Sequence, residues 1–259
     1  MVISLLSPIV TDIGGGYLFF KDVLRSALKK WPRRELVFQQ IWMVSTQSAS
    51  TTALAGFFVG AVMTVQFTMQ IKQFGALGYL GGLSTSATIR EIGPLLIAFM
   101  LSGKVGAFTS AELGTMRVTE QIDAIRCLGA DPIQEIILPR FLGIVVSSFF
   151  LLAVGLFMSI FGGLFLGVLF AGINPEEYLR HVPAIVKWPS LAIGLFKCFT
   201  FAVLLGGICT YKGYTTTGGA VGVGKSVVNT AVSTMVAIVV ADWITSVIAE
   251  SAGIIYMSW

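Results

Sequence analysis

Residues 36–71 read LVFQQIWMVSTQSASTTALAGFFVGAVMTVQFTMQI, and none of these 36 residues is charged. A helix that crosses a bilayer needs about 20 predominantly apolar residues, so this stretch is long enough to span a membrane. Its first half is rich in Ser, Thr and Gln, which predicts that the helix faces other protein or a cavity there. Gly56 and Gly60 form a G-x-x-x-G pattern, which predicts a surface for the close approach of another helix.

The composition of the whole chain also indicates a membrane protein. Of the 259 residues, 55% are hydrophobic and 12% are charged, whereas soluble domains carry roughly 25% charged residues. So few charges cannot cover a soluble globule, which excludes a disordered regulator, a secreted disulfide scaffold and an ordinary cytosolic enzyme. The 3 cysteines and the single histidine are scattered, so we expect no structural metal site and no protein-bound cofactor.

Four further segments are apolar enough to cross a membrane. Residues 141–175 carry no charge, and residues 226–249 carry only Asp242. Residues 84–111 are interrupted by three charges, and residues 184–211 hold Lys197 in their interior. We therefore predict an all-α membrane protein whose residues 36–259 form a domain of five transmembrane helices.

Residues 1–35 precede the first predicted span and contain an amphipathic pattern at 17–31, YLFFKDVLRSALKKW. Apolar side chains recur at helical spacing on one face, and charged side chains occupy the other. Pro32 ends the pattern. We predict an interfacial amphipathic helix that lies flat on an anionic cytoplasmic membrane surface. The alternative is a helix that packs on a soluble core.

Residues 112–135 interrupt the hydrophobic pattern between the second and third spans. They carry many charges of both signs, yet apolar residues still recur at helical spacing. This predicts a short amphipathic helix at about 112–128 outside the membrane, with Gly129 as its C-terminal cap. Asp131 followed by Pro132 predicts the start of the next helix. The charged helix is either a solvated loop or a surface that a partner grips, and the pattern favours neither.

Several ionisable residues lie inside the predicted spans. A charge at the bilayer centre costs about 3 kcal/mol or more, so such residues face a cavity or pair with each other. For Arg90, Glu91 and Lys197 two interpretations are equally supported. One is a polar site that holds a charged headgroup, and the other is a set of structural ion pairs. Lys104 and Glu250 lie near predicted span ends, which favours side chains that extend to the interface.

The distribution of basic residues predicts the orientation. With five spans, the side that holds the N-terminus carries 12 Lys and Arg residues and the other side carries 4. Cytoplasmic segments are the ones enriched in Lys and Arg. We therefore predict a cytoplasmic N-terminus and a C-terminus on the opposite side.

A glycine-rich segment predicted as a loop at 212–225, before the last span, runs into a match to the P-loop pattern G-x-x-x-x-G-K-[ST] at Gly219, Gly224, Lys225 and Ser226. A P-loop follows a β-strand inside an α/β domain, whereas this segment follows a predicted membrane helix. The match therefore predicts a tight glycine loop rather than a nucleotide site. We expect the chain to have no ATPase site of its own and to be no enzyme.

Residues 90–126, REIGPLLIAFMLSGKVGAFTSAELGTMRVTEQIDAIR, resemble the signature of the MlaE (YrbE) permease family. The segment GGAVGVG at 218–224 is similar to the family's loop before its last span. The resemblance covers most of the chain from about residue 36 onward. It implies the multi-pass permease subunit of an ABC transporter that moves phospholipids or other lipids between the inner and outer bacterial membranes.

The resemblance also implies partners. Two copies pair in the inner membrane, and each docks on a cytoplasmic ATPase subunit that binds the ATP. An MCE-domain protein lies on the periplasmic side, where the C-terminus would be, and some members have a small cytoplasmic STAS-domain partner. Nucleic acid is not among the expected partners.

The family's functional positions are carried over residue by residue. Residues 112–128 would be the cytoplasmic coupling helix, and its ATPase contacts would be Glu112, Arg117, Glu120 and Asp123. The lipid-binding positions would be Arg90, Glu91 and Lys197. Asp242 matches an acidic position in the last span. Lys104 stands where the family commonly has Arg, which keeps the charge but loses the bidentate fork.

Two alternatives come from other functional classes. One is an ion- or proton-coupled secondary transporter or channel that uses Arg90, Glu91 and Asp242. The other is a structural scaffold for the MCE-domain partner. The coupling-helix stretch favours the ABC permease over the secondary transporter.

Overall fold

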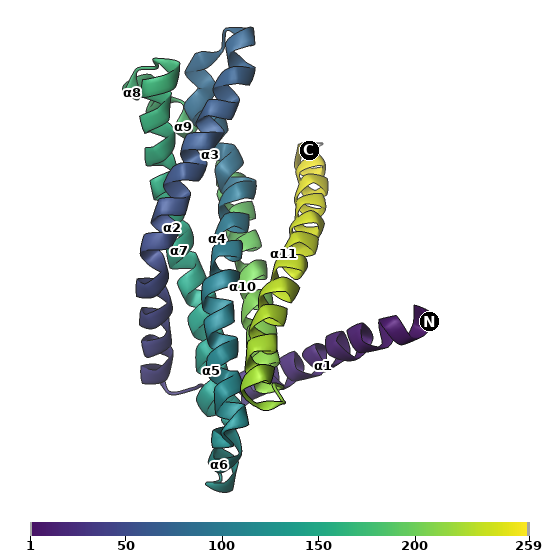
Figure 1. Ribbon diagram of the computed structural model, residues 1–259. Coiled ribbons are helices and arrows are strands. Elements are labelled where there is room, and N and C mark those ends of the chain that lie inside the picture. The colour runs from purple at the N-terminus through teal and green to yellow at the C-terminus, as the bar shows by residue number, and fades with distance from the viewer. Residues whose placement is uncertain (1, 258–259) are drawn as a thin grey trace. The chain divides into compact units, whose positions relative to one another are not determined.

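The computed structural model describes the backbone of residues 2–257 and the side chains of residues 11–251. Over residues 2–257 the chain is helical and contains no strand. Its long helices (Figure 1) are α1 (Val2–Lys29), α2 (Arg34–Ile71), α7 (Leu138–Ala171), α10 (Trp188–Tyr214) and α11 (Gly219–Met257).

Shorter helical segments connect the long helices. Between α2 and α7 they are η1 (Lys72–Phe74), η2 (Leu77–Tyr79), α3 (Leu80–Ala87), η3 (Thr88–Ile92), α4 (Gly93–Leu101), η4 (Ser102–Gly106), α5 (Ala107–Val118), α6 (Gln121–Cys127) and η5 (Ile133–Ile137). Between α7 and α10 they are α8 (Pro175–Arg180) and α9 (Val182–Ile185). The segments η3, η4 and η5 are π-helical turns.

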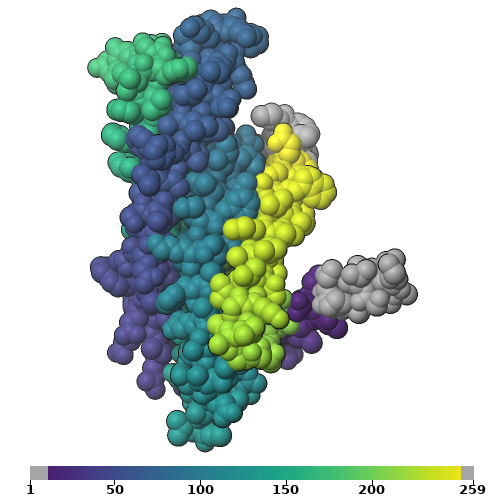
Figure 2. Space-filling view, viewed as in Figure 1, coloured from purple at the N-terminus to yellow at the C-terminus, as the bar shows by residue number. Residues whose placement is uncertain are grey.

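Five helical segments are long and apolar enough to cross a membrane, which confirms the predicted five-span, all-α fold. They are Arg34–Phe74, Leu77–Val118, Ile133–Ala171, Trp188–Tyr214 and Gly219–Ser251. Many of the exposed side chains of helix α11 (Figure 2) are large and apolar, Trp243 among them. Such a surface is suited to lipid or to another membrane subunit.

The predicted helix at 112–128 is wrong as a single element. Helix α5 continues the second span to Val118, and α6 begins at Gln121 after Glu120, which has a left-handed backbone (φ 59°). Leu113 and Ile122 are nine positions apart and would face opposite sides of a straight helix. Both are almost fully buried. The break at Glu120 turns both toward the core.

The ends of this region agree with the sequence patterns. Gly129 follows α6 with φ 77°, as expected of a glycine that ends a helix. Asp131 Oδ1 accepts a hydrogen bond from the Ile133 amide (3.0 Å), as expected of a helix N-cap. Asn174 likewise accepts from the Glu176 amide at the start of α8.

The predicted glycine loop at 212–225 is also wrong in extent. Helix α10 continues to Tyr214, and α11 begins at Gly219. Gly218 and Gly219 have φ of 89° and 65°, so the tight turn lies at these two glycines, and Gly219 is also the first residue of α11. Gly224, Lys225 and Ser226 lie inside α11 and follow another helix, which is not the geometry of a P-loop.

The chain divides into two compact units. Unit 1 comprises the chain up to Val44 together with Leu101–Val146 and Val203–Ala237. Unit 2 comprises Ser45–Met100, Ser147–Ala202 and the chain from Ile238 onward. Each unit is described by itself below.

Unit 2 contains the helix contact that the G-x-x-x-G pattern predicts. A Cβ added to Gly60 of α2 would overlap the backbone oxygen of Ser159 in α7, and one added to Gly56 would overlap that of Gly155. From the other side, a Cβ on Gly162 would overlap the Phe57 oxygen. The close approach of α2 and α7 is thus confirmed.

Unit 1 contains α1. This helix begins at Val2, earlier than the pattern at 17–31 predicts, and ends at Lys29 before Pro32. Phe19 and Val23 on its apolar face are buried, which shows that this face packs on protein. Its place on a membrane surface stays a prediction.

Candidate functional site

A cluster of charged side chains lies within unit 2. Lys197 of α10 is fully buried (0% exposed), and its Nζ donates to Asp242 Oδ1 (3.0 Å) and Ser246 Oγ (2.7 Å) of α11. It also donates to Glu91 Oε2 of η3. An ammonium group has three protons to donate, so this geometry uses all of them. Ser246 Oγ in turn donates to Glu91 Oε2 (3.2 Å).

The local backbone explains how α10 reaches Glu91. A Cβ added to Gly194 would lie 2.5 Å from the backbone oxygen of Ile89, so α10 contacts the η3 backbone directly. Lys197 lies three residues after Gly194 and therefore on the same side of α10. The π-helical turn that holds Glu91 is a feature found frequently at functional sites.

Arg90, the neighbour of Glu91, has a different partner. Its Nη2 lies 3.9 Å from Glu250 Oε2, and the two side chains are 40% and 75% exposed. An exposed pair at this distance contributes about 0–1 kcal/mol. The structure thus brings Glu91, Lys197 and Asp242 together and leaves Arg90 only loosely paired.

Apart from Glu91, the partners of these two cations come from one face of α11. Asp242, Ser246 and Glu250 follow each other at i, i+4 and i+8, which places them on one side of the helix. Sequence analysis included Asp242 and Glu250 and missed Ser246. The i+4 spacing from Asp242 was the signal that could have found it.

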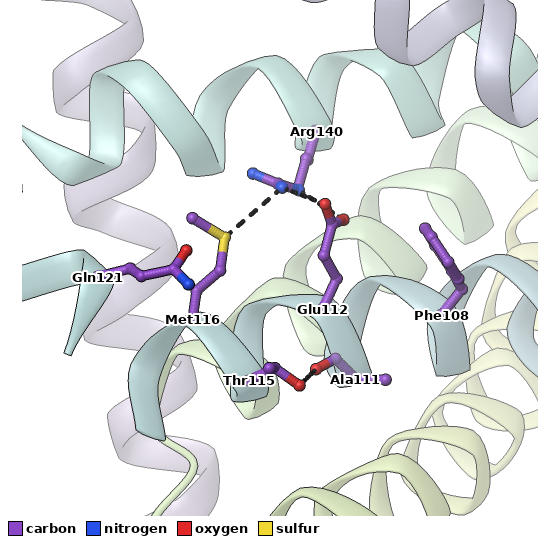
Figure 3. A pocket seen from close by; sticks show the side chains of 7 residues that line it. All are labelled: Phe108, Ala111, Glu112, Thr115, Met116, Gln121 and Arg140. Atoms are coloured by element: carbon purple, nitrogen blue, oxygen red, sulfur yellow. Dashed lines mark hydrogen bonds and ion pairs between the residues drawn. The ribbon is translucent and has the colours of Figure 1, made fainter. Parts of the chain in front are cut away.

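A second polar site lies in unit 1, where α5, α6 and α7 line a cavity of about 550 Å³ (Figure 3). Arg140 of α7 donates to both carboxylate oxygens of Glu112 (2.8 and 3.2 Å) and is only 11% exposed. Its Nη2 also lies 3.8 Å from Met116 Sδ. The lining residues are Phe108, Ala111, Glu112, Thr115, Met116, Gln121 and Arg140. Sequence analysis gave Arg140 no role, because its partner Glu112 is 28 residues away.

The α5–α6 corner next to this cavity is held by ion pairs. Arg117 Nη1 donates to both oxygens of Asp123 (2.8 and 2.9 Å), and Arg126 Nη1 lies 3.3 Å from Asp123 Oδ1. Three of the four residues expected to contact an ATPase therefore have charged partners within the chain: Glu112, Arg117 and Asp123. The fourth, Glu120, is exposed at the break between the helices.

Lys104 lies in the π-helical turn η4, and its side chain is exposed. It belongs to unit 1, whereas Lys197 and Asp242 belong to unit 2.

A comparison with known families decides the identity of this architecture. The family model described as permease MlaE matches residues 37–248. The chain belongs to the MlaE permease family.

Named relatives of this MlaE permease come from bacteria and from a plant. A probable ABC transporter permease protein of Synechocystis sp. is 34% identical over 213 residues, which cover 82% of this chain and 81% of that protein. One of Rickettsia conorii is 29% identical over 233 residues, 90% of each chain. The Arabidopsis thaliana protein TRIGALACTOSYLDIACYLGLYCEROL 1, chloroplastic, is 31% identical over 80% of this chain and 59% of that protein.

The family assignment confirms the resemblance seen in residues 90–126. It makes the chain an ABC transporter permease of the MlaE family, and the names of its relatives favour a permease subunit over an enzyme. A permease of this class works with an ATPase subunit.

Proposed function

We propose that this chain is the permease subunit of an ABC transporter that moves phospholipids or related lipids between the inner and outer membranes of a bacterium. The observation that carries the proposal is the MlaE family match over residues 37–248. The name of the Arabidopsis relative contains a galactolipid, which supports a lipid substrate.

The proposed assembly contains two copies of the chain in the inner membrane, each with a cytoplasmic ATPase subunit. An MCE-domain protein lies on the periplasmic side, and a STAS-domain protein is a further candidate partner. The excess of Lys and Arg near the N-terminus and near the α5–α6 corner supports a cytoplasmic location for both.

Arg90 is the residue proposed to contact the lipid phosphate. Its side chain is 40% exposed and loosely paired, and its guanidinium is shaped for bidentate contact with phosphate oxygens. Lys197 is the weaker candidate for this contact because Glu91, Asp242 and Ser246 accept all three of its protons. Glu91 and Lys197 belong to the site as the ion-paired cluster around the buried Lys197, which holds the η3 turn, and Arg90 with it, in place.

Replacing Arg90 by Gln is expected to lower the amount of co-purified phospholipid about tenfold, which corresponds to about 1.4 kcal/mol. Native mass spectrometry of the gently extracted complex measures both the lipid and the subunits. Glu250→Gln is the matched control, since it removes the partner of Arg90 without removing the cation, and it should retain lipid. An intact Arg90→Gln complex with unchanged lipid would contradict this role.

The α5–α6 corner is proposed to dock on the ATPase. Glu120 is exposed at the break between the two helices. The Glu112–Arg140 pair lines the adjacent cavity (Figure 3). A cavity of this kind, with apolar walls and a paired charge, suits an inserted side chain of a partner.

Replacing Glu120 by Lys is expected to weaken ATPase binding about tenfold, because an exposed charge at the docking surface is reversed. Glu120→Gln is the comparison that isolates the charge, since the left-handed backbone at this position costs Lys and Gln a similar free energy. Binding of the purified ATPase to the detergent-solubilised chain provides the measurement. Equal affinities for the two variants would remove Glu120 from the interface. A wild-type chain that binds no ATPase would favour the coupled-transporter alternative.

A further inference from the structure

Tyr214, at the C-terminal end of α10, joins three helices of unit 1. Its hydroxyl oxygen accepts a hydrogen bond from Arg126 Nη2 of α6. The guanidinium carbon of Arg126 lies 5.9 Å from the centre of the Tyr214 ring. The ring of Phe19 in α1 lies 5.3 Å from the same ring. Tyr214 therefore contacts α6 through its polar end and α1 through its ring.

Helix α6 has few other constraints on its position. It is 7 residues long, and Ile122 is its only buried residue. Isolated helices shorter than about 12 residues are marginal in water, so tertiary contacts must hold it. These contacts are the pairs of Asp123 with Arg117 and Arg126, and the bond from Arg126 to Tyr214.

Helix α1 is fastened to the same unit at both ends of its described part. Gln134 Nε2 donates to the backbone oxygens of Ser26 (2.8 Å) and Lys30 (3.0 Å), which caps the C-terminal end of α1. Lys212 Nζ donates to Asp12 Oδ2 (2.7 Å). The ring of Phe19 in α1 lies against Tyr214, and Tyr214 in turn accepts from Arg126, so an unbroken series of contacts runs from α1 to α6.

We propose that Tyr214 is a positioning residue that holds Arg126, and with it α6, in the orientation that links ATP hydrolysis to lipid movement. This inference rests on the proposed docking of the α5–α6 corner on the ATPase. Asp123 and Arg126 form the internal support of the corner, whereas Glu120 faces the partner. Removing the Tyr214 hydroxyl should leave docking intact and loosen α6.

The test compares Tyr214→Phe with Tyr211→Phe. The first keeps the ring against Phe19 and removes the acceptor for Arg126. The second alters a neighbouring tyrosine whose ring lies 5.7 Å from that of Phe19 and whose hydroxyl lies beside Gly15 of α1. Both variants retain aromatic packing, so both are expected to fold.

A nitroxide label on Cys127 reports on α6 directly, since Cys127 is exposed at the end of α6 while Cys198 and Cys209 are buried. In Tyr214→Phe the label should rotate about twofold faster, on the nanosecond scale of local motions. Tyr211→Phe should leave the spectrum unchanged. In vesicles that carry the whole complex, Tyr214→Phe should lower the lipid moved per ATP about fivefold with unchanged ATPase affinity.

A double-mutant cycle that combines Tyr214→Phe with Arg126→Gln adds a test of the pair, with the mobility of the Cys127 label as the measured quantity. Two residues that act through one bond give non-additive effects on such a quantity. An unchanged Cys127 spectrum in Tyr214→Phe, or additive effects in the cycle, would overturn the positioning role. A wild-type chain that binds no ATPase would instead overturn the proposed function, and the binding step alone reveals this. The label spectrum still decides whether Tyr214 orders α6.

Discussion

Replacing Lys197 by Met is expected to destabilise the protein by about 2 kcal/mol, because it leaves Asp242, which is only 21% exposed, without its buried cation, while Glu91, which is 48% exposed, stays partly solvated. Lys197 is fully buried and is the shared partner of Glu91 and Asp242. Met has a similar length and is apolar, so the loss reflects charge rather than a cavity. The midpoint of thermal unfolding of the detergent-purified chain measures the effect.

The matched control neutralises the whole cluster. The triple variant Lys197→Met, Glu91→Gln and Asp242→Asn removes the cation and both anions together, and it should recover most of the lost stability. This recovery would show that the penalty comes from uncompensated charge. A Lys197→Met protein as stable as the wild type would show that the three side chains are not paired in the folded protein.

Replacing Gly60 by Val is expected to cost about 3 kcal/mol, at the upper end of the usual range for overpacking. The added Cβ would overlap the backbone oxygen of Ser159, and a backbone atom cannot move aside as a flexible side chain can. Helices in a membrane associate largely through such close packing, so α2 and α7 would have to separate. The measurement is the yield of monodisperse protein and its unfolding midpoint.

Gly224→Val is the matched control for this prediction. Gly224 also lies inside a long helix, but an added Cβ there meets nothing within 4 Å. The same change of side chain should therefore alter stability by no more than about 1 kcal/mol. Equal losses for the two variants would mean that the α2–α7 contact does not limit stability.

The features that the sequence predicted correctly depend on neighbours along the chain. The five spans follow from long uncharged runs, and the caps at Gly129 and Asp131 follow from residue types that suit the end of a helix. The G-x-x-x-G contact was predictable because only glycine permits such an approach. The family was recognisable from the motif at 90–126.

The features that the sequence did not predict depend on distant packing. The break at Glu120 was missed because the helical pattern of residues 112–128 looks continuous, and only the burial of both Leu113 and Ile122 requires the corner. Tyr214 was missed because its partner Arg126 is 88 residues away. No local pattern links two such positions.

The sequence by itself determined the class of this protein, its spans and the presence of charges inside them, because these depend on composition and on the length of apolar runs. Only the tertiary structure decided which charges pair. Lys197 meets Glu91 and Asp242 across 106 and 45 residues, whereas Arg90, next to Glu91 in the chain, has Glu250 as its partner. Hydrogen bonds form only when donor and acceptor lie within about 3 Å. The packing of η3, α10 and α11 within unit 2 therefore separates the roles of two cations that the sequence presented as equivalent.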